Sequence, residues 1–247
     1  MNIITVLFNE ALYRPLFNGL IFLYNIIPLH DFGIAIILLT IIIRLILYPL
    51  NQKAIKSQKA LGELQPQIKE VQAKYSADKV KQSQALMDLY KKNNINPASG
   101  CLPLLIQLPI MIALYRVFWN GLNPDSLTAL YSFISRPAQV DPMFLGFMNL
   151  ANSNYVLAIL AGIFTFWQSK MMVSVQPNAG QGTDFSAAMN KQMVYFMPLF
   201  TVFIAWKLPA GLALYWVVTT LAGIAQQYLV MRKHGNNRSQ LTPKDIR

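Results

Sequence analysis

The chain has 247 residues, of which 54% are hydrophobic and only 13% are charged, and its formal net charge is +11. A soluble domain carries closer to a quarter charged residues, so this composition excludes an ordinary soluble globular protein. Several apolar runs reach the roughly 17–25 residues that a helix needs to cross a bilayer, which predicts an all-α polytopic membrane protein.

Residues 1–30 alternate apolar runs with polar interruptions. This pattern favours an amphipathic helix lying at the outer membrane interface. A signal anchor is the alternative, and it would place residue 1 in the cytoplasm. The interrupting residues are Asn9, Glu10, Arg14, Pro15, Asn18 and Asn25.

Residues 32–50 form the first predicted span and contain Arg44. Thirteen of these nineteen residues are Leu, Ile or Phe. A charged guanidinium costs roughly 2.5–3.5 kcal/mol at the bilayer centre, whereas each large apolar residue contributes roughly 0.3–0.6 kcal/mol, so the segment still inserts. A charge that stability does not require indicates a functional site. The alternative is that Arg44 only snorkels to cytoplasmic headgroups.

Residues 51–97 are polar and basic, unlike the apolar spans, because nine lysines fall between Lys53 and Lys92. Apolar residues recur there at three- and four-residue steps, which predicts a cytoplasmic helical hairpin of coiled-coil type. Ser76 is the predicted N-cap of its second arm. A solvated loop is the simpler alternative. The stripe consists of Leu61, Leu64, Ile68, Val71 and Tyr75, and the second arm runs through Val80, Met87 and Tyr90 to Lys92.

Four further spans are predicted at residues 101–119, 155–173, 193–206 and 211–231. The fourteen-residue segment 193–206 is short for a span, so it either begins earlier, near Ala187, or crosses a locally thinned bilayer. The predicted organisation is then an outer-face segment (1–30), a five-helix transmembrane core (31–50 and 98–231), the hairpin (51–97) and a basic tail (232–247).

The distribution of Lys and Arg predicts the orientation. Sixteen of the 21 positive residues lie in the hairpin, in the loop holding Lys170 and Lys191, and in the tail, against Arg14, Arg136 and Lys207 on the other side. Cytoplasmic loops carry the excess of positive charge, so the N-terminus is predicted outside and the C-terminus in the cytoplasm. The tail fits ribosomal RNA phosphates or anionic lipid equally well.

The predicted spans contain no His, Asp or Glu. Intramembrane enzymes and proton relays need such groups, so we expect no catalytic residue, no metal, no cofactor and no enzymatic activity. The same lack argues against a proton-coupled transporter, although a transporter or channel that uses Arg44 as an anion site stays the alternative.

A sparse polar set accompanies Arg44, which lies about 9 Å inside Leu50 on a helix. We expect this set to converge on a cavity open to the inner leaflet and the cytoplasm. Each member also has a purely structural alternative. Gln107 would hydrogen-bond carbonyls that its neighbouring prolines leave without a donor. Trp216 would anchor the helix at the membrane interface, and Gln168 would form polar surface near the headgroups. Arg116 is expected only to snorkel. The set comprises Thr40, Gln107, Gln168, Trp216, Thr219 and Thr220.

Residues 96–110 (NPASGCLPLLIQLPI) resemble the signature of the YidC/Oxa/Alb family of membrane protein insertases. Similar matches occur at Tyr48-Pro49-Leu50, at Leu64-Gln65-Pro66 and at residues 208–215 (LPAGLALY). The resemblance extends from about residue 10 to residue 232, with the motifs in the family's order.

The resemblance implies five transmembrane helices around a hydrophilic inner-leaflet groove, lined by Arg44, with Thr40, Gln168 and Trp216 beside incoming substrate. It implies an insertase and chaperone whose partners are nascent membrane proteins and the lipid bilayer. The tail would contact ribosomes, the Sec translocon is a further candidate partner, and DNA is not expected. An Arg-rich transit peptide is absent, which favours a bacterial cell membrane. A passive assembly scaffold is a third interpretation.

Overall fold

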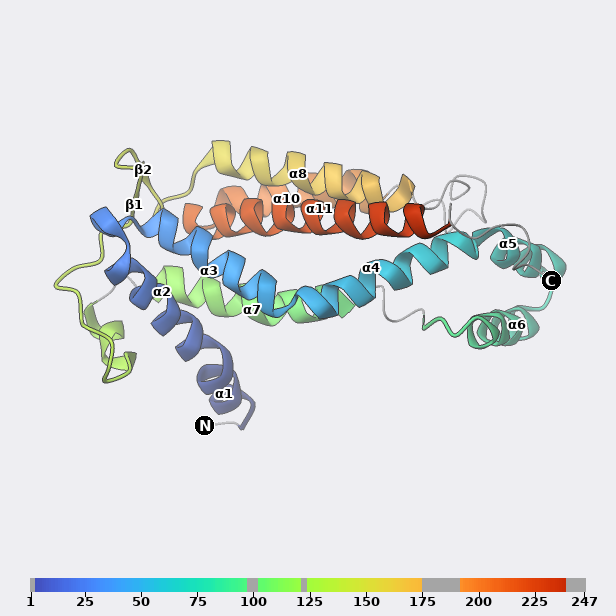
Figure 1. Cartoon of the computed structure of the whole chain (residues 1–247), viewed down its shortest axis with the longest axis horizontal. Helices are drawn as coiled ribbons and strands as arrows, with labels where there is room; N and C mark the ends of the chain where they lie inside the picture. Colours follow the sequence, from blue (N-terminus) through green and yellow to red (C-terminus); the bar gives the residue numbers. More distant parts are fainter. Residues whose placement is uncertain (1–2, 97–101, 121–123, 175–191, 239–247) are drawn as a thin grey trace. The chain divides into compact units, whose positions relative to one another are not determined.

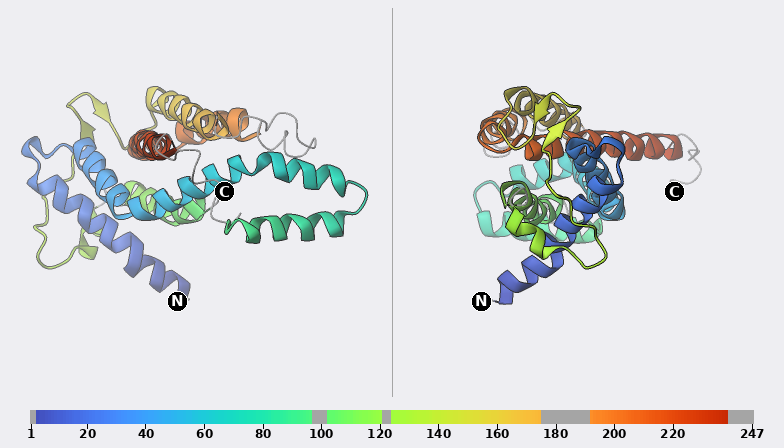
Figure 2. Two further views of the ribbon diagram at one scale, coloured as in Figure 1. Left: turned by 45° about the vertical axis from the view of Figure 1, so that its right-hand side comes forward. Right: turned by 90° about the vertical axis from the view of Figure 1, so that its left-hand side faces the viewer.

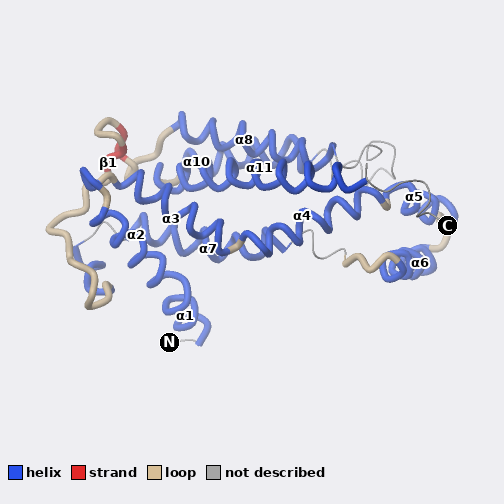
Figure 3. The backbone as a smooth tube through the Cα atoms, in the orientation of Figure 1, coloured by secondary structure: helices blue, strands red, loops and turns tan. Residues whose placement is uncertain are grey.

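The computed structural model of the chain describes residues 3–96, 102–120, 124–174 and 192–238. Helices make up most of this part, with one pair of short strands (Figure 1, Figure 3). The chain divides into two compact units. The first comprises Met1–Leu47, Leu104–Thr165 and Met197–Leu221, and the second comprises Tyr48–Pro103, Phe166–Phe196 and Ala222–Arg247.

The first unit starts with a helix that runs through a π-helical turn. It consists of α1 (Ile3–Phe8), the turn (Asn9–Tyr13) and α2 (Arg14–Ile26). One face of α2 is buried beside α3, and Ile26 on another face is 59% exposed. The segment is helical, as the sequence predicts, and its amphipathic role at the outer interface stays a prediction.

Asn18 is a polar interruption in the sequence that the structure explains. Its side chain is buried, its amide donates to the carbonyl oxygens of Arg14 (2.8 Å) and Ala129 (3.2 Å), and its oxygen accepts from the N–H of Tyr131 (2.6 Å). A buried polar group has to be hydrogen-bonded, and here the bonds attach the loop after α7 to α2.

Helix α3 (Phe32–Ile46) follows a 3-10 turn (Pro28–His30), and Asp31 is its N-cap residue. One carboxylate oxygen of Asp31 accepts from the N–H of Ile34 (2.8 Å), as an N-cap does. The other accepts from the N–H of Leu145 (2.6 Å), which lies in the turn between β1 (Met143–Phe144) and β2 (Met148–Asn149). Asp31 therefore fixes both the start of α3 and the strand pair.

The first predicted span is wrong as one continuous helix. Helix α3 ends at Ile46, Leu47 lies in a turn, and α4 (Tyr48–Glu63) begins next. Pro49 has no N–H to donate to a carbonyl of the preceding turn, whereas proline is tolerated in the first turn of a new helix.

The other helices of the first unit pack closely where glycine permits it. A Cβ on Gly162 of α8 would lie 2.2 Å from Val202 and 3.2 Å from the carbonyl oxygen of Pro198, so its absence lets α8 approach α10. The shared core includes Ile36, Leu114 and Leu212. The helices that lie wholly or partly in the first unit are α7 (Leu102–Asn120), a 3-10 helix (Pro124–Ala129), α8 (Tyr155–Ser174), α10 (Met197–Lys207) and α11 (Ala210–Arg238). A π-helical turn (Gln192–Phe196) of the second unit precedes α10 in the chain.

By length and composition, two helical stretches of the described residues are able to cross a membrane, at Tyr155–Met172 and Ala210–Arg232. A third is reached if α3 and α4 form one broken span. Leu105–Trp119 and Val194–Lys207 are shorter apolar helices. The five-span arrangement thus stays a prediction. Residues 187–191, where an earlier start of the segment 193–206 was expected, lie outside the described part.

In the second unit, α5 (Gln65–Lys74) packs against α6 (Lys79–Lys92) as a helical hairpin, which the left view of Figure 2 shows. Leu64 and Ile68 of the predicted stripe are buried, and the amide of Gln82 donates to the carbonyl oxygen of Gln72 (2.8 Å). On α6, however, Val80 is 69% exposed and Met87 is 48% exposed.

The predicted N-cap Ser76 is wrong, because the cap is Asp78. Its backbone is extended, and its carboxylate accepts from the N–H groups of Val80 (3.2 Å) and Lys81 (3.0 Å). The N–H of Ser76 instead bonds the carbonyl oxygen of Ala73 (3.4 Å), in the turn after α5. Serine and aspartate both cap helices well, so residue type did not distinguish them. The turn after α5 extends far enough that Asp78, not Ser76, directly precedes α6.

The apolar stretch Ala210–Arg232 agrees with the span expected at residues 211–231. Helix α11 itself continues to Arg238, into the predicted tail. The rest of the predicted tail, residues 239–247, lies outside the described part, and so do residues 97–101 of the signature.

Candidate functional site

Arg44 lies in the last turn of α3 and turns away from that helix's exposed apolar face. Leu45 and Ile46 beside it are 66% and 71% exposed, whereas Arg44 is half-buried. Its Nε donates a 2.8 Å hydrogen bond to the hydroxyl of Thr219 on α11. The guanidinium is therefore held inside the first unit.

A second hydrogen bond lies next to that of Thr219. The amide of Gln107 on α7 donates to the hydroxyl of Tyr215 (2.5 Å), which lies one turn before Thr219 on α11. Tyr215 and Thr219 are 3% and 7% exposed. The two bonds, Arg44–Thr219 and Gln107–Tyr215, thus join α3 and α7 to one face of α11, and we call these four residues the polar network.

The polar network positions the positive charge without neutralising it. A guanidinium has five N–H donors, and the Thr219 hydroxyl accepts from one of them. Among the described residues, no carboxylate lies within ion-pair distance of Arg44. Away from bulk water such a charge acts strongly on a nearby anion. The site is therefore suited to attract a negative group.

The other predicted site residues have separate environments. Thr40 is 1% exposed, and its hydroxyl donates to the carbonyl oxygen of Ile36 (2.6 Å) in its own helix. Trp216 is half-buried on α11, next to Tyr215. Gln168 is half-buried on α8 and belongs to the second unit. The structure thus places Arg44 and Gln107 against the same face of α11, and the groove roles of all five predicted residues stay predictions.

Tyr215 was missed by the sequence analysis, and Thr219 was not distinguished from Thr220. The hydroxyl of Thr220 donates to the carbonyl oxygen of Trp216 (2.8 Å) in its own helix, so it takes no part in the polar network. The four-residue spacing of Tyr215 and Thr219 places both on one helix face, which was the available signal.

Arg116 belongs to a different cluster. It is exposed on α7, its Nη1 donates to the side-chain oxygen of Asn9 (3.3 Å), and its guanidinium lies 5.1 Å from the ring centroid of Phe8. Arg116, which was expected only to snorkel, therefore contacts Phe8 of α1 and Asn9 of the π-helical turn Asn9–Tyr13.

The sequence profile of the family described as "60Kd inner membrane protein" matches residues 22–237. The chain belongs to this family, the YidC/Oxa family. The match to the YidC/Oxa family runs from α2 into the last turn of α11, so it includes every member of the polar network.

Individual relatives in the YidC/Oxa family are similar over most of the chain. The membrane protein insertase YidC of Fusobacterium nucleatum is 37% identical over 224 residues, which are 90% of this chain and 98% of the relative. That of Oceanobacillus iheyensis is 37% identical over 205 residues, 81% of this chain and 75% of the relative. That of Leptospira interrogans is 34% identical over 229 residues, 90% of this chain but 35% of the relative.

Proposed function

We propose that this chain is an insertase and chaperone for membrane proteins, as the names of its relatives suggest. A hydrophilic groove lined by Arg44, Thr40, Gln107, Gln168 and Trp216 receives the nascent protein and releases it into the bilayer. The observation that carries the proposal is the Arg44 guanidinium, held by Thr219 and uncompensated by any described carboxylate.

The groove acts by lowering the cost of moving a polar stretch across the membrane. Polar groups without hydrogen-bond partners cost several kcal/mol each in hydrocarbon, and a hydrated groove supplies those partners. The charge of Arg44 attracts a polar or acidic tail of the client. No covalent step is needed, and the function is not enzymatic.

Partitioning supplies the driving force for release. Once the tail has crossed, the apolar client segment leaves the groove for lipid, because burial of apolar surface in hydrocarbon is favourable. The membrane potential adds about 2.3 kcal/mol per charge per 100 mV to the movement of a charged tail. A locally thinned bilayer at the short span over residues 193–206 would shorten the crossing.

The remaining parts recruit clients and set the topology. In this proposal the chain lies in the bacterial cell membrane with its N-terminus outside and its C-terminus in the cytoplasm. The hairpin of α4, α5 and α6 meets clients on the cytoplasmic side. The basic tail contacts the ribosome, and the Sec translocon is a further candidate partner.

Site-directed photocrosslinking tests the groove. A photoreactive residue placed at position 40, 107, 168 or 216 should crosslink a ribosome-stalled nascent membrane protein. Phe133 is the matched control position, because its side chain is 77% exposed in the loop after α7, outside the proposed groove. Equal crosslinking from position 133 and from the four groove positions would contradict the proposal.

Charge variants of Arg44 separate the insertase from the alternative functions. In proteoliposomes, Arg44→Lys should retain most client insertion, whereas Arg44→Glu should reduce it at least about tenfold, the effect of 1.4 kcal/mol. Anion flux without client insertion would instead identify a transporter or channel. Full insertion by Arg44→Ala, with loss on deletion of the hairpin, would identify a scaffold.

A further inference from the structure

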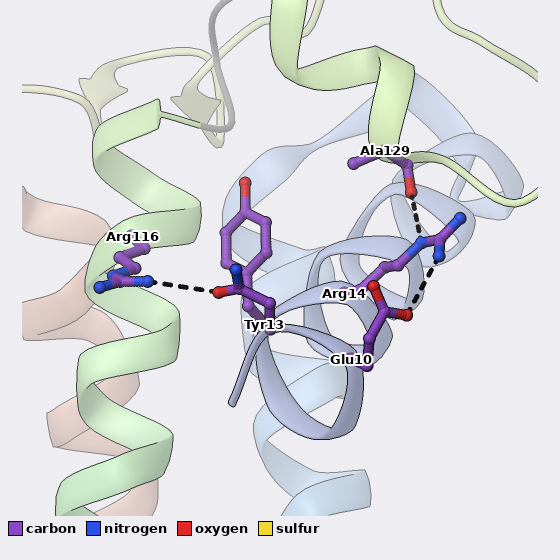
Figure 4. Close-up of a pocket in the computed structure, with 6 residues that line it drawn as sticks. Glu10, Tyr13, Arg14, Arg116 and Ala129 are labelled. Carbon is purple, nitrogen blue, oxygen red and sulfur yellow. Dashed lines mark hydrogen bonds and ion pairs between the residues drawn. The ribbon is translucent and has the colours of Figure 1, made fainter. Parts of the chain in front are cut away.

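A second positively charged site lies between the N-terminal helix and α7. Here the first unit has an open pocket, a surface cavity of about 440 Å³, lined by Asn9, Glu10, Tyr13, Arg14, Arg116 and Ala129 (Figure 4). None of these residues belongs to the polar network around Arg44. The cavity therefore needs its own explanation.

Its two arginines are held in place, yet most of their donors have no hydrogen-bond partner among the described residues. The Nη1 of Arg14 donates to the Glu10 carboxylate (3.1 Å) and its Nε to the carbonyl oxygen of Ala129 (3.3 Å). Arg116 donates to Asn9, and no described carboxylate lies within ion-pair distance of it. With two guanidinium groups against one carboxylate, the cavity retains a net positive charge.

Aromatic rings fix the direction of both guanidinium groups. Arg116 lies over Phe8 and Arg14 over Tyr131, each 5.1 Å from the ring centroid. Stacking of this kind orients the planar group while its edge donors stay available to a ligand. Planar forks of N–H donors match the oxygens of a phosphate group.

Exposed apolar side chains flank the cavity on both elements. On α1, Ile3 is 85% exposed and Leu7 is 65% exposed. On α7, Ile112 is 48% exposed and lies four residues before Arg116, on the same helix face. Exposed apolar surface beside a cationic site suits a ligand that carries hydrocarbon chains as well as an anionic group.

We propose that this cavity binds the phosphate group of a membrane phospholipid, with Arg116 and Arg14 on the phosphate and the acyl chains along Ile3, Leu7 and Ile112. Asn9 and Tyr13 supply further hydrogen bonds. Burial raises the pKa of the Tyr13 hydroxyl, and the charge of Arg116 opposes this only in part, so the hydroxyl stays protonated and able to donate. The bound lipid then links the N-terminal helix to α7.

Native mass spectrometry of the full chain, delipidated and supplied with single compounds, tests the proposal. The probes are dioleoyl-phosphatidylglycerol, dioleoylglycerol with the same chains but no phosphate, and inorganic phosphate. Phosphatidylglycerol should bind at least about tenfold more tightly than either of the others, since charge-assisted hydrogen bonds to phosphate are worth that much. Equal binding of dioleoylglycerol or of inorganic phosphate would overturn the proposal.

Variants test whether the binding depends on the charges of Arg116 and Glu10. Arg116→Gln should weaken phosphatidylglycerol binding about tenfold, whereas Arg136→Gln, at an exposed arginine that does not line this cavity, should leave it unchanged. Glu10→Gln removes the competing carboxylate and should strengthen binding a few-fold. Equal binding by the two arginine variants would overturn the proposal. If Arg116→Gln fails to fold, the Glu10→Gln variant decides instead, and unchanged binding of phosphatidylglycerol by Glu10→Gln would then overturn the proposal. These readouts do not depend on client insertion.

Discussion

The hydrogen bond from Arg44 Nε to the hydroxyl of Thr219 spans 2.8 Å and joins residues 175 positions apart in the chain. It connects the end of α3 to the middle of α11. One turn earlier on α11, the hydroxyl of Tyr215 accepts from the amide of Gln107, so α3 and α7 are both hydrogen-bonded to the same face of α11.

Thr219→Val should impair insertion while leaving the fold intact. The valine has nearly the same shape but offers Arg44 no acceptor, and a hydrogen bond to a charged group is worth about 1.5–3 kcal/mol. Client insertion in proteoliposomes should fall about tenfold or more. Thr220→Val is the matched control, because that hydroxyl bonds only its own helix. Equal losses in the two variants would rule out a special role for Thr219.

Tyr215→Phe should destabilise the first unit by about 1–3 kcal/mol, because it leaves the half-buried amide of Gln107 without its acceptor. The loss is measured as a lower thermal midpoint in detergent micelles. Gln107→Leu combined with Tyr215→Phe removes both partners, so the double variant should lose less than the sum of the single losses. Strict additivity would show that the two side chains do not interact.

Gly33→Ala should destabilise the contact between α3 and the strand pair. An added Cβ would lie 2.1–2.7 Å from the Cδ2, Cγ and Cβ atoms of Phe144, so that ring has to move. Overpacking of this kind costs about 1–3 kcal/mol of unfolding free energy. Gly19→Ala is the control, since its Cβ would meet only a terminal methyl of Leu39 at 3.3 Å. Phe144→Ala should rescue Gly33→Ala, and no rescue would place the strain elsewhere.

Asp78→Ala should loosen the start of α6, and Ser76→Ala should not. Hydrogen bonds from the N–H and side chain of Lys81 lower the pKa of Asp78 below its ordinary value of 3.8. A depressed carboxyl pKa stabilises the folded state above the unfolded pKa, and the contribution is lost as the pH falls through the folded pKa. The protection of the Val80 and Lys81 amides against hydrogen exchange, relative to their intrinsic rates at the same pH, should therefore fall in Asp78→Ala and on strong acidification. Faster exchange in Ser76→Ala would restore Ser76 as the cap.

The helices of this protein could be predicted from local pattern, and their exact ends could not. The helix expected at residues 155–173 is observed at Tyr155–Ser174, because a long apolar run is read without knowledge of its neighbours. The break at Leu47 and the cap at Asp78 depend on where one helix leaves room for the next. Several residue types satisfy such a boundary equally well, so the pattern alone did not choose among them.

The candidate site was predictable in its charge and in the membership of Gln107 and Thr219, but its pairings were not. Arg44 stands out in sequence because a cation within an apolar run is costly, but nothing in the sequence chooses Thr219, 175 positions away, over Thr220 as its partner. The role of Asn18 was likewise not predictable from the sequence. It interrupts an apolar run, and its side chain hydrogen-bonds backbone groups of Ala129 and Tyr131.

Composition, apolar run length and the placement of Lys and Arg are properties of the chain itself, so the sequence alone determined a helical membrane protein with one conspicuous arginine inside an apolar run. Tertiary packing alone decided which hydroxyl holds that arginine, and that Arg116 meets Asn9 and Phe8. Hydrogen bonds act over about 3 Å, so their partners are set when helices pack together and leave no periodic trace along the chain.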